Sequence, residues 1–188
     1  MKRFFSLVII LFVLLVSIFI MISPTFFGNT LTRFEVKKEV KLPLVLDDSR
    51  DVKLLFFGYS GCINVCTPRL RDLSTLYETF DESIKKRVGI EFIDISTPDD
   101  EMLPQAFATA FHPDFKGIYL NSKVLREYTK AFEVYFSQSL IDKTEFYHTS
   151  NLYILKKVNG KKEIRFIYNT YPYNFEQIRR DIMELINE

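Results

Sequence analysis

This sequence of 188 residues has no clear excess of charge of either sign. Its 25 basic and 24 acidic residues leave a formal net charge of +1. A surface that binds nucleic acid normally shows a clear excess of Lys and Arg, so nucleic acid is not expected as the main partner. Internal repeats and low-complexity segments are also lacking. With 47% hydrophobic and 26% charged residues, the chain has the composition of a globular protein with room for one domain and an appendage.

The appendage is an apolar stretch from Phe4 to Ile22, interrupted only by two serines. A helix of this length spans roughly 28 Å, about the thickness of a bilayer's hydrocarbon core. A cleaved signal peptide is the alternative, because Lys2 and Arg3 form a positive n-region. However, the stretch is longer than a usual h-region and lacks a small-x-small cleavage site. We therefore expect residues 1–23 to be an uncleaved N-terminal transmembrane anchor helix.

Basic residues flank this stretch on its N-terminal side, and the next one after it is Arg33. This asymmetry places the N-terminus in the cytoplasm and exports everything after residue 23. An Arg-rich amphipathic leader of the mitochondrial kind is lacking, which favours a single-pass protein of the bacterial inner (cytoplasmic) membrane with a periplasmic domain. The cysteines would then lie in an oxidising compartment.

Residues 24–43 mix Pro, Gly and Asn with alternating charge and are predicted to form a tether, followed by a folded domain over residues 44–188. A continuous apolar run of the kind found in buried central strands opens the domain, and Thr67 and Pro68 supply a helix N-cap and a first-turn proline. Asn159 and Gly160 predict a tight hairpin turn. The expected elements are strands at 52–59 and 89–95, helices at 67–80, 99–111 and 122–136, a hairpin at 152–155 and 164–168, and a helix at 174–187.

The predicted order, βαβααββα, is that of an α/β protein with a thioredoxin-like fold. The first two strands are joined by a helical crossover and should be parallel. If the strand at 152–155 pairs antiparallel beside the first strand, the residues preceding it lie at the same sheet edge as those following Tyr59. His148 would then meet the loop that carries the two cysteines.

Cys62 and Cys66 stand four positions apart in FFGYSGCINVCTPRL, and their pattern allows three interpretations. A disulfide would close so small a loop that it constrains the unfolded chain least. Thiol redox catalysis usually uses C-x-x-C at a helix start, whereas three residues intervene here. The third interpretation is a site for a soft metal ion.

The ligand count favours copper over zinc for such a site. A closed zinc site usually has four protein ligands, and the chain has only two histidines beyond its two cysteines. Two thiolates and one imidazole suit Cu(I). His148 is placed near the thiols by the predicted topology, whereas His112 follows a helix, precedes a proline and is expected to be structural or solvated. The candidate metal ligands are therefore Cys62, Cys66 and His148.

The cysteine segment resembles the hallmark of the Sco (SenC, PrrC) family, FFGYTHCPDVCP followed by a helix. The likeness extends to the N-terminal anchor, the strand with Asp94, the segment with Val134 and Tyr135, and one late histidine before a hairpin. Members of that family are membrane-anchored thioredoxin-fold proteins that carry copper to the binuclear copper site of cytochrome c oxidase. The resemblance implies Cys62, Cys66 and His148 as ligands of Cu(I) or Cu(II), and a copper donor and the copper subunit of the oxidase as partners.

The sequence also departs from the family pattern. Ile63 and Asn64 replace the proline and aspartate after the first cysteine, Pro68 is displaced from its usual place, and Tyr147 replaces the aspartate before the histidine. Acidic groups that would tune copper affinity or thiol pKa are thus lost. The alternatives to copper delivery are a periplasmic thiol-disulfide reductase, for which Cys62 and Cys66 would be catalytic, and a redox or copper sensor.

Overall fold

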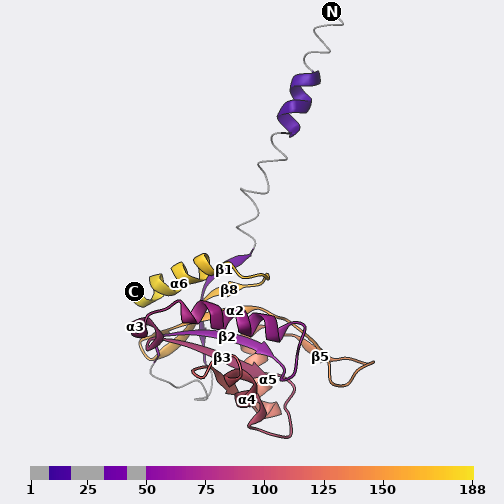
Figure 1. Ribbon diagram of the computed structural model, residues 1–188, viewed down its shortest axis with the longest axis vertical. Coiled ribbons are helices and arrows are strands. Elements are labelled where there is room, and N and C mark those ends of the chain that lie inside the picture. Colours follow the sequence, from indigo (N-terminus) through magenta and orange to yellow (C-terminus); the bar gives the residue numbers. More distant parts are fainter. Residues whose placement is uncertain (1–8, 18–31, 42–49) are drawn as a thin grey trace, which may run out of the picture. The chain divides into compact units, whose positions relative to one another are not determined.

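The computed structural model describes residues 9–17, 32–41 and 50–188, and the chain divides into two units, Met1–Phe34 and Glu35–Glu188 (Figure 1). In the first unit, residues 9–17 are helical, with exposed aliphatic side chains. The described parts contain no helix with both the length and the apolar character needed to cross a bilayer. Most of the expected anchor, residues 1–8 and 18–23, lies outside the described residues.

The second unit is built on a mixed six-stranded sheet in the order β1-β8-β7-β2-β3-β4, with a separate two-stranded sheet formed by β5 and β6. The elements are β1 (Arg33–Val40), β2 (Val52–Gly58), α2 (Cys66–Glu78), α3 (Glu82–Lys85), β3 (Val88–Asp94), α4 (Leu103–Thr109), β4 (Lys116–Ile118), α5 (Ser122–Phe132), β5 (Phe136–Gln138), β6 (Phe146–His148), β7 (Leu152–Val158), β8 (Lys161–Tyr168) and α6 (Phe175–Asn187).

The central strands confirm the predicted pairing. β2 runs parallel to β3, with Phe56 opposite Phe92, and antiparallel to β7, with Phe56 opposite Leu152. β2 and β3 are buried along their whole length, as their continuous apolar runs indicated. Asn159 and Gly160 both have positive φ angles, which is the conformation that a tight turn between β7 and β8 requires.

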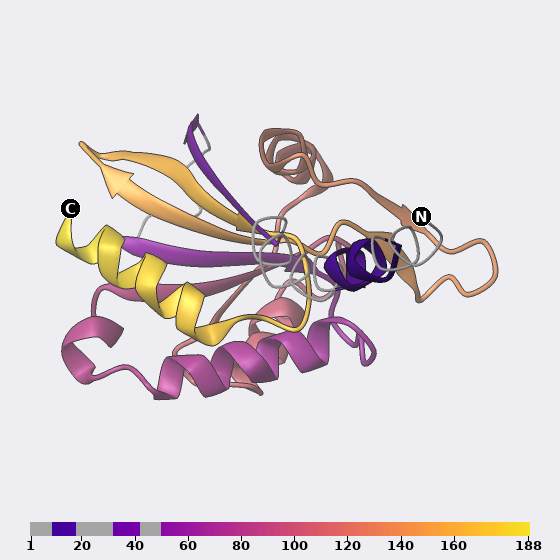
Figure 2. The same ribbon diagram turned by 90° about the horizontal axis from the view of Figure 1, so that it is seen from above.

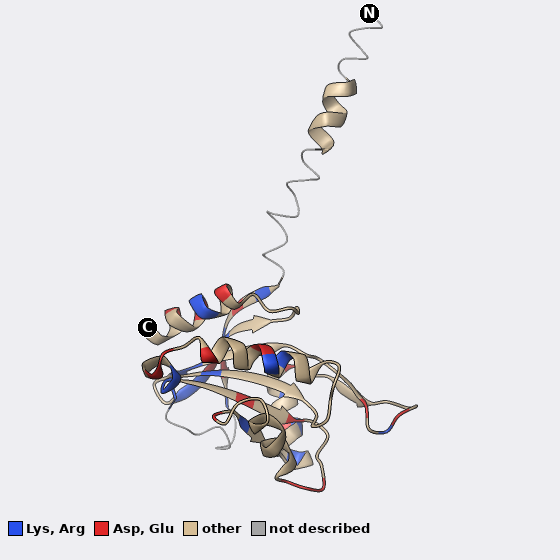
Figure 3. Ribbon diagram, in the orientation of Figure 1, with Lys and Arg blue, Asp and Glu red and all other residues tan. Residues whose placement is uncertain are grey.

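Helices cover both faces of this sheet (Figure 2). α2 and α6 lie on one face, and α5 lies on the other. On the α5 face, the Phe57 ring packs against Phe132 of α5 and Tyr153 of β7, with ring centroids 5.3 and 5.9 Å apart. Figure 3 shows charges of both signs spread over helices and strands, in line with the near-zero net charge.

Several elements differ from those that the sequence predicted. Part of the expected tether is folded, because Arg33–Val40 forms β1 at the edge of the sheet. α5 ends at Phe132, where Glu133 adopts a left-handed conformation, and the chain then enters β5. α2 begins at Cys66, so Thr67 lies inside the helix and is not its N-cap. Strands β4, β5 and β6 and the short helix α3 were not predicted.

Candidate functional site

The two cysteines lie in the turn that connects β2 to α2. Both are free thiols, and both are buried. The backbone N–H of Cys62 donates to the Tyr59 carbonyl at 3.2 Å. The Cys62 carbonyl in turn accepts from the backbone N–H of Thr67 at 3.1 Å and from its hydroxyl at 2.9 Å. Thr67 therefore anchors the cysteine turn to the first turn of α2 instead of capping the helix.

The turn places the sulfur of Cys62 at the N-terminus of α2. The backbone N–H of Cys66 donates to Cys62 Sγ at 3.3 Å. A hydrogen bond from the Cys66 thiol, together with one from the Cys66 backbone N–H, lowers the pKa of Cys62 to about 3. The same thiol bond, together with burial, raises the pKa of Cys66. At neutral pH the pair therefore holds one thiolate, on Cys62, and one thiol, on Cys66.

Alkylation of Cys62 by iodoacetamide is expected to proceed at a nearly constant rate between about pH 5 and 8, because a lowered pKa keeps the thiolate populated throughout. A cysteine with an ordinary pKa near 8.5 would lose about tenfold in rate per pH unit below that value. Replacing Cys66 with alanine removes the strongest stabilising bond and should restore a steep pH dependence. Peptide mass spectrometry of timed samples reads the rate, and a steep profile in the unmutated protein would contradict the assignment.

His148 reaches the cysteines from the two-stranded sheet, where it ends β6 and faces Phe136 of β5. Its Nδ1 lies 3.0 Å from the Thr149 carbonyl, which can only accept, so Nδ1 carries the proton. Nε2 is left with a free lone pair and lies 4.0 Å from Cys66 Sγ. The ring packs edge-on against Phe56 and Tyr59, with centroids 6.4 and 6.1 Å apart. The contacts with Thr149, Phe56 and Tyr59 thus fix the orientation of the His148 ring.

The separation of sulfur and nitrogen is close to what a shared metal ion requires. With bonds of about 2.3 Å to sulfur and 2.0 Å to nitrogen, two donors lie ~3.7 Å apart in a trigonal arrangement and ~4.3 Å apart in a linear one. The observed 4.0 Å between Cys66 Sγ and His148 Nε2 falls between these values. Among the described residues, no group of three or more His, Cys, Asp or Glu side chains is arranged to hold a metal ion. Cys66 and His148 are therefore the two donors at bridging distance.

Gly58, the last residue of β2, makes room for the Cys66 sulfur. A Cβ at this position would lie 2.6 Å from Cys66 Sγ and 2.9 Å from the Phe92 ring. The sequence offered a signal for this that we did not use, since a glycine in a strand often marks a close approach of another group.

Replacing Gly58 with alanine is expected to displace the Cys66 thiol and to lower the free energy of unfolding by about 1–3 kcal/mol, the usual cost of overpacking. Urea denaturation measures the stability, and the alkylation profile of Cys62 reports the disturbed thiol pair. Gly89→Ala in β3 is the matched control, because its Cβ would approach the flexible Arg50 side chain at 3.2 Å and Lys53 Cγ only at 3.9 Å. Equal effects of the two substitutions would contradict the role of Gly58.

Asp94 ties the cysteine loop to the end of β3. One carboxylate oxygen accepts from the backbone N–H of Ser60 at 2.9 Å, and the other accepts from the backbone N–H of Ser96 at 2.8 Å. Both serine hydroxyls also donate to it. This fully buried carboxylate therefore positions the loop two residues ahead of Cys62.

A link that the sequence does not predict joins the two-stranded sheet to the cysteine loop. The Tyr59 hydroxyl donates to the Glu145 carboxylate, and the Tyr59 ring packs on Phe146 with centroids 5.3 Å apart. Burial and the bond to Glu145 raise the pKa of Tyr59, which stays neutral. Tyr59 belongs to the quoted FFGY motif, but nothing in the sequence singles out Glu145, 86 positions away.

The residues that depart from the family pattern lie on the surface around this site. The side chains of Ile63 and Tyr147 are 76% and 69% exposed, and Asn64 is also exposed. An open hollow of about 560 Å³ lies beside His148, lined further by Tyr135, Phe136, Ser137, Tyr147 and Thr149. The rim of the candidate site is therefore aromatic and aliphatic, where acidic groups were expected from the family pattern.

His112 does not belong to the site and has a structural place in the fold, one of the two roles expected of it. It is 8% exposed, its Nε2 is 2.7 Å from Glu78, and its ring packs on Tyr77 and Phe115 with centroids 4.9 and 5.2 Å apart. The backbone N–H of Asp114 donates to its Nδ1 at 3.1 Å. His112 therefore joins α2 to the loop after α4.

Comparisons with known proteins show the family of this chain and proteins of similar fold. The SCO1/SenC family model matches residues 49–187. An SCO2-like protein of Rickettsia conorii is 23% identical over 138 residues, which cover 70% of this chain and 65% of that protein. The solution structure of apo Sco1 from Thermus thermophilus (TM-score 0.63, 24% identity) covers 82% of this chain and 93% of its own. Copper-bound ScoI from Arabidopsis thaliana has a TM-score of 0.62 at 16% identity, covering 73% of this chain and 84% of its own. With most of its length matched by the family model, the chain belongs to the SCO1/SenC family.

Proposed function

We propose that this protein binds one copper ion through Cys62, Cys66 and His148 and delivers it to the binuclear copper site of cytochrome c oxidase during assembly. The observation that carries the proposal is the half-buried imidazole of His148, whose Nε2 lies 4.0 Å from the sulfur of Cys66, next to a second sulfur. Membership in the SCO1/SenC family and the copper bound by the Arabidopsis protein support the choice of metal.

The donor set has the chemistry that Cu(I) prefers. Cys62 is already a thiolate, the Nε2 of His148 has a free lone pair, and Cys66 must lose its proton to bind. Loading would therefore release a proton and would require both thiols to be reduced. A three-ligand site leaves room for an acceptor cysteine to attack the metal, so that copper passes by ligand exchange from a donor protein to the oxidase subunit.

We further propose that residues 1–23 anchor the chain in the bacterial inner membrane and that the folded domain lies in the periplasm. The apolar stretch and its flanking charges support this arrangement. With β1 beginning at Arg33, the connection between anchor and domain shortens to residues 24–32. Anchoring would raise the effective concentration of the domain near a membrane-embedded acceptor.

Anaerobic titration of a fragment beginning at Thr32 with Cu(I) tests the copper proposal. We expect one equivalent to bind, with two sulfur donors and one nitrogen donor in X-ray absorption spectra. A fully reduced protein that binds no copper, or that binds it without a nitrogen donor, would overturn the proposal.

One observation favours a thiol-disulfide reductase as the second candidate. The pKa of Cys62 is lowered next to a second thiol at the start of a helix, which is the environment of a nucleophilic cysteine. In this role Cys62 would attack a disulfide in an oxidase or another acceptor, and Cys66 would resolve the mixed disulfide. Removing the His148 ring should then leave most of the reductase rate intact, whereas it should abolish tight copper binding.

A further inference from the structure

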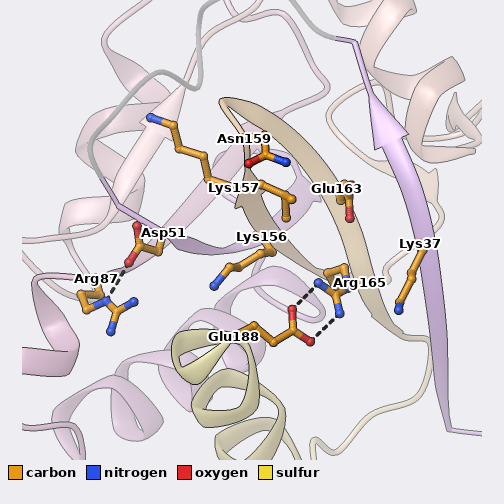
Figure 4. Close-up of a pocket in the computed structure, with 10 residues that line it drawn as sticks. Lys37, Asp51, Arg87, Lys156, Lys157, Asn159, Glu163, Arg165 and Glu188 are labelled. Atoms are coloured by element: carbon orange, nitrogen blue, oxygen red, sulfur yellow. Dashed lines mark hydrogen bonds and ion pairs between the residues drawn. The ribbon is translucent and has the colours of Figure 1, made fainter.

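A polar cavity of about 520 Å³ lies at the end of the sheet opposite to the cysteines (Figure 4). Asp51, which precedes β2, is part of its lining, whereas the cysteine loop follows β2. The rest is formed by residues of β7 and β8, one residue of β1, Arg87 just before β3, and Glu188 just after α6. Its lining contains five basic side chains and three carboxylates, namely Lys37, Arg87, Lys156, Lys157 and Arg165, and Asp51, Glu163 and Glu188.

Two of the basic side chains are buried in the wall of this cavity. Arg165 is 5% exposed and Lys156 is 9% exposed. Nη1 and Nη2 of Arg165 form a two-pronged bond to the Glu188 carboxylate, at 2.6 and 2.7 Å. The Arg165 Nε is buried and has no hydrogen-bond partner among the described residues. Burial of a guanidinium is costly, so its place in a cavity wall calls for a reason.

Capping of α6 explains part of this charge. Lys156 donates to the carbonyl of Leu185, and Nη2 of Arg87 donates to the carbonyl of Ile186 at 2.9 Å, which satisfies the last turn of the helix. It does not explain Lys37 and Lys157, which are exposed; Lys37 helps to lower the pKa of the Glu188 carboxyl. Capping of α6 does not explain the buried guanidinium of Arg165 either.

We propose that this cavity binds a phosphate group, and that Glu188 occupies the position of that group in the empty site. The planar guanidinium fork matches phosphate and carboxylate oxygens equally well, so a phosphate can take the place of Glu188 on Arg165. In Figure 4, Glu188 lies between Lys156 and Arg165, which would then both face the ligand. The cavity volume is in the range of small-molecule sites and exceeds that of a single phosphate. The phosphate therefore belongs to a larger molecule, either a soluble phosphate ester or a phospholipid headgroup.

The first test uses the full chain in a maltoside detergent, titrated calorimetrically with inorganic phosphate in a phosphate-free buffer. We expect saturable binding at one site. Glu188→Gln should strengthen it about threefold or more, because the competing carboxylate is lost, and Arg165→Met should weaken it at least about tenfold. If the Arg165–Glu188 pair were only structural, Glu188→Gln would not strengthen binding.

Substitutions of exposed residues test the proposal without disturbing the fold. Lys37→Gln and Lys157→Gln leave the buried contacts intact and together should weaken phosphate binding several-fold. Lys143→Gln, in the exposed loop between β5 and β6, is the matched control and should change nothing. Absence of saturable binding, or binding that the Lys37 and Lys157 substitutions leave unchanged, overturns the proposal.

The source of the phosphate is distinguished by repeating the titration in nanodiscs that contain phosphatidylglycerol. If a lipid headgroup fills the cavity, inorganic phosphate no longer binds in the nanodiscs, although it binds in detergent. If the ligand is a soluble ester, the affinity is the same in both. Copper binding by the cysteine site should be unaffected by all of these substitutions.

Discussion

Replacing His148 with alanine is expected to weaken Cu(I) binding by at least about 100-fold. Loss of a group that merely orients a metal ligand typically costs 10–100-fold in affinity, and loss of the ligand itself should cost no less. Without the imidazole, only the two sulfurs remain, and one of them is held by the N–H at the start of α2. Competition against a chromophoric Cu(I) chelator measures the affinity.

His112→Ala is the matched control, since it removes the only other histidine of the chain. His112 pairs with Glu78 and packs among aromatic rings, so its loss should lower stability and leave the copper affinity within about threefold of the unmutated value at temperatures where the variant stays folded. Equal losses of affinity in the two variants, or an unchanged affinity in His148→Ala, would show that His148 is not a ligand.

Glu91→Leu alone should lower the free energy of unfolding by about 3–5 kcal/mol. Its carboxylate lies 2.6 Å from the ammonium of Lys53, and the two side chains are only 2% and 4% exposed, respectively. Removing the carboxylate leaves an ammonium group buried without this partner. The double variant Lys53→Met with Glu91→Leu removes both charges and should recover most of the loss, because a buried pair can often be replaced by apolar residues at little net cost.

Urea denaturation of the fragment beginning at Thr32 measures each variant, and the double-mutant cycle isolates the coupling between the two residues. Lys38→Met serves as the control, because it breaks an ion pair to Glu133 of similar length, 2.7 Å, whose side chains are 45% and 71% exposed. It should cause no measurable loss. A double variant as unstable as Glu91→Leu would show that Glu91 contributes through contacts other than its pairing with Lys53.

The sequence predicted the elements whose signals are strong and local. The buried runs of β2 and β3, the Asn159–Gly160 turn and the apolar face of α6 all carry a clear period or a specific turn residue. The approach of His148 to the cysteines followed from topology alone, because β7 pairs antiparallel with β2.

The exposed or charged strands carry no such signal, so they were not predicted. β1 reads RFEVKKEV and is mostly exposed, as is common for an edge strand, so it was mistaken for part of a tether. β5 and β6 are three residues each and mostly exposed, which leaves no burial period to detect. Contacts such as Tyr59 to Glu145 and Gly58 to Cys66 depend on the packing of segments that only the folded chain brings together.

His148, the third candidate ligand, belongs to a different part of the fold from the two cysteines. Cys62 and Cys66 belong to the turn between β2 and α2, whereas His148 ends a separate two-stranded ribbon joined to that turn by Tyr59 and a few ring contacts. A small swing of the ribbon could thus open the coordination sphere while the six-stranded scaffold stays intact. If the proposed copper site forms, the metal would leave through this opening while the rest of the domain stays folded.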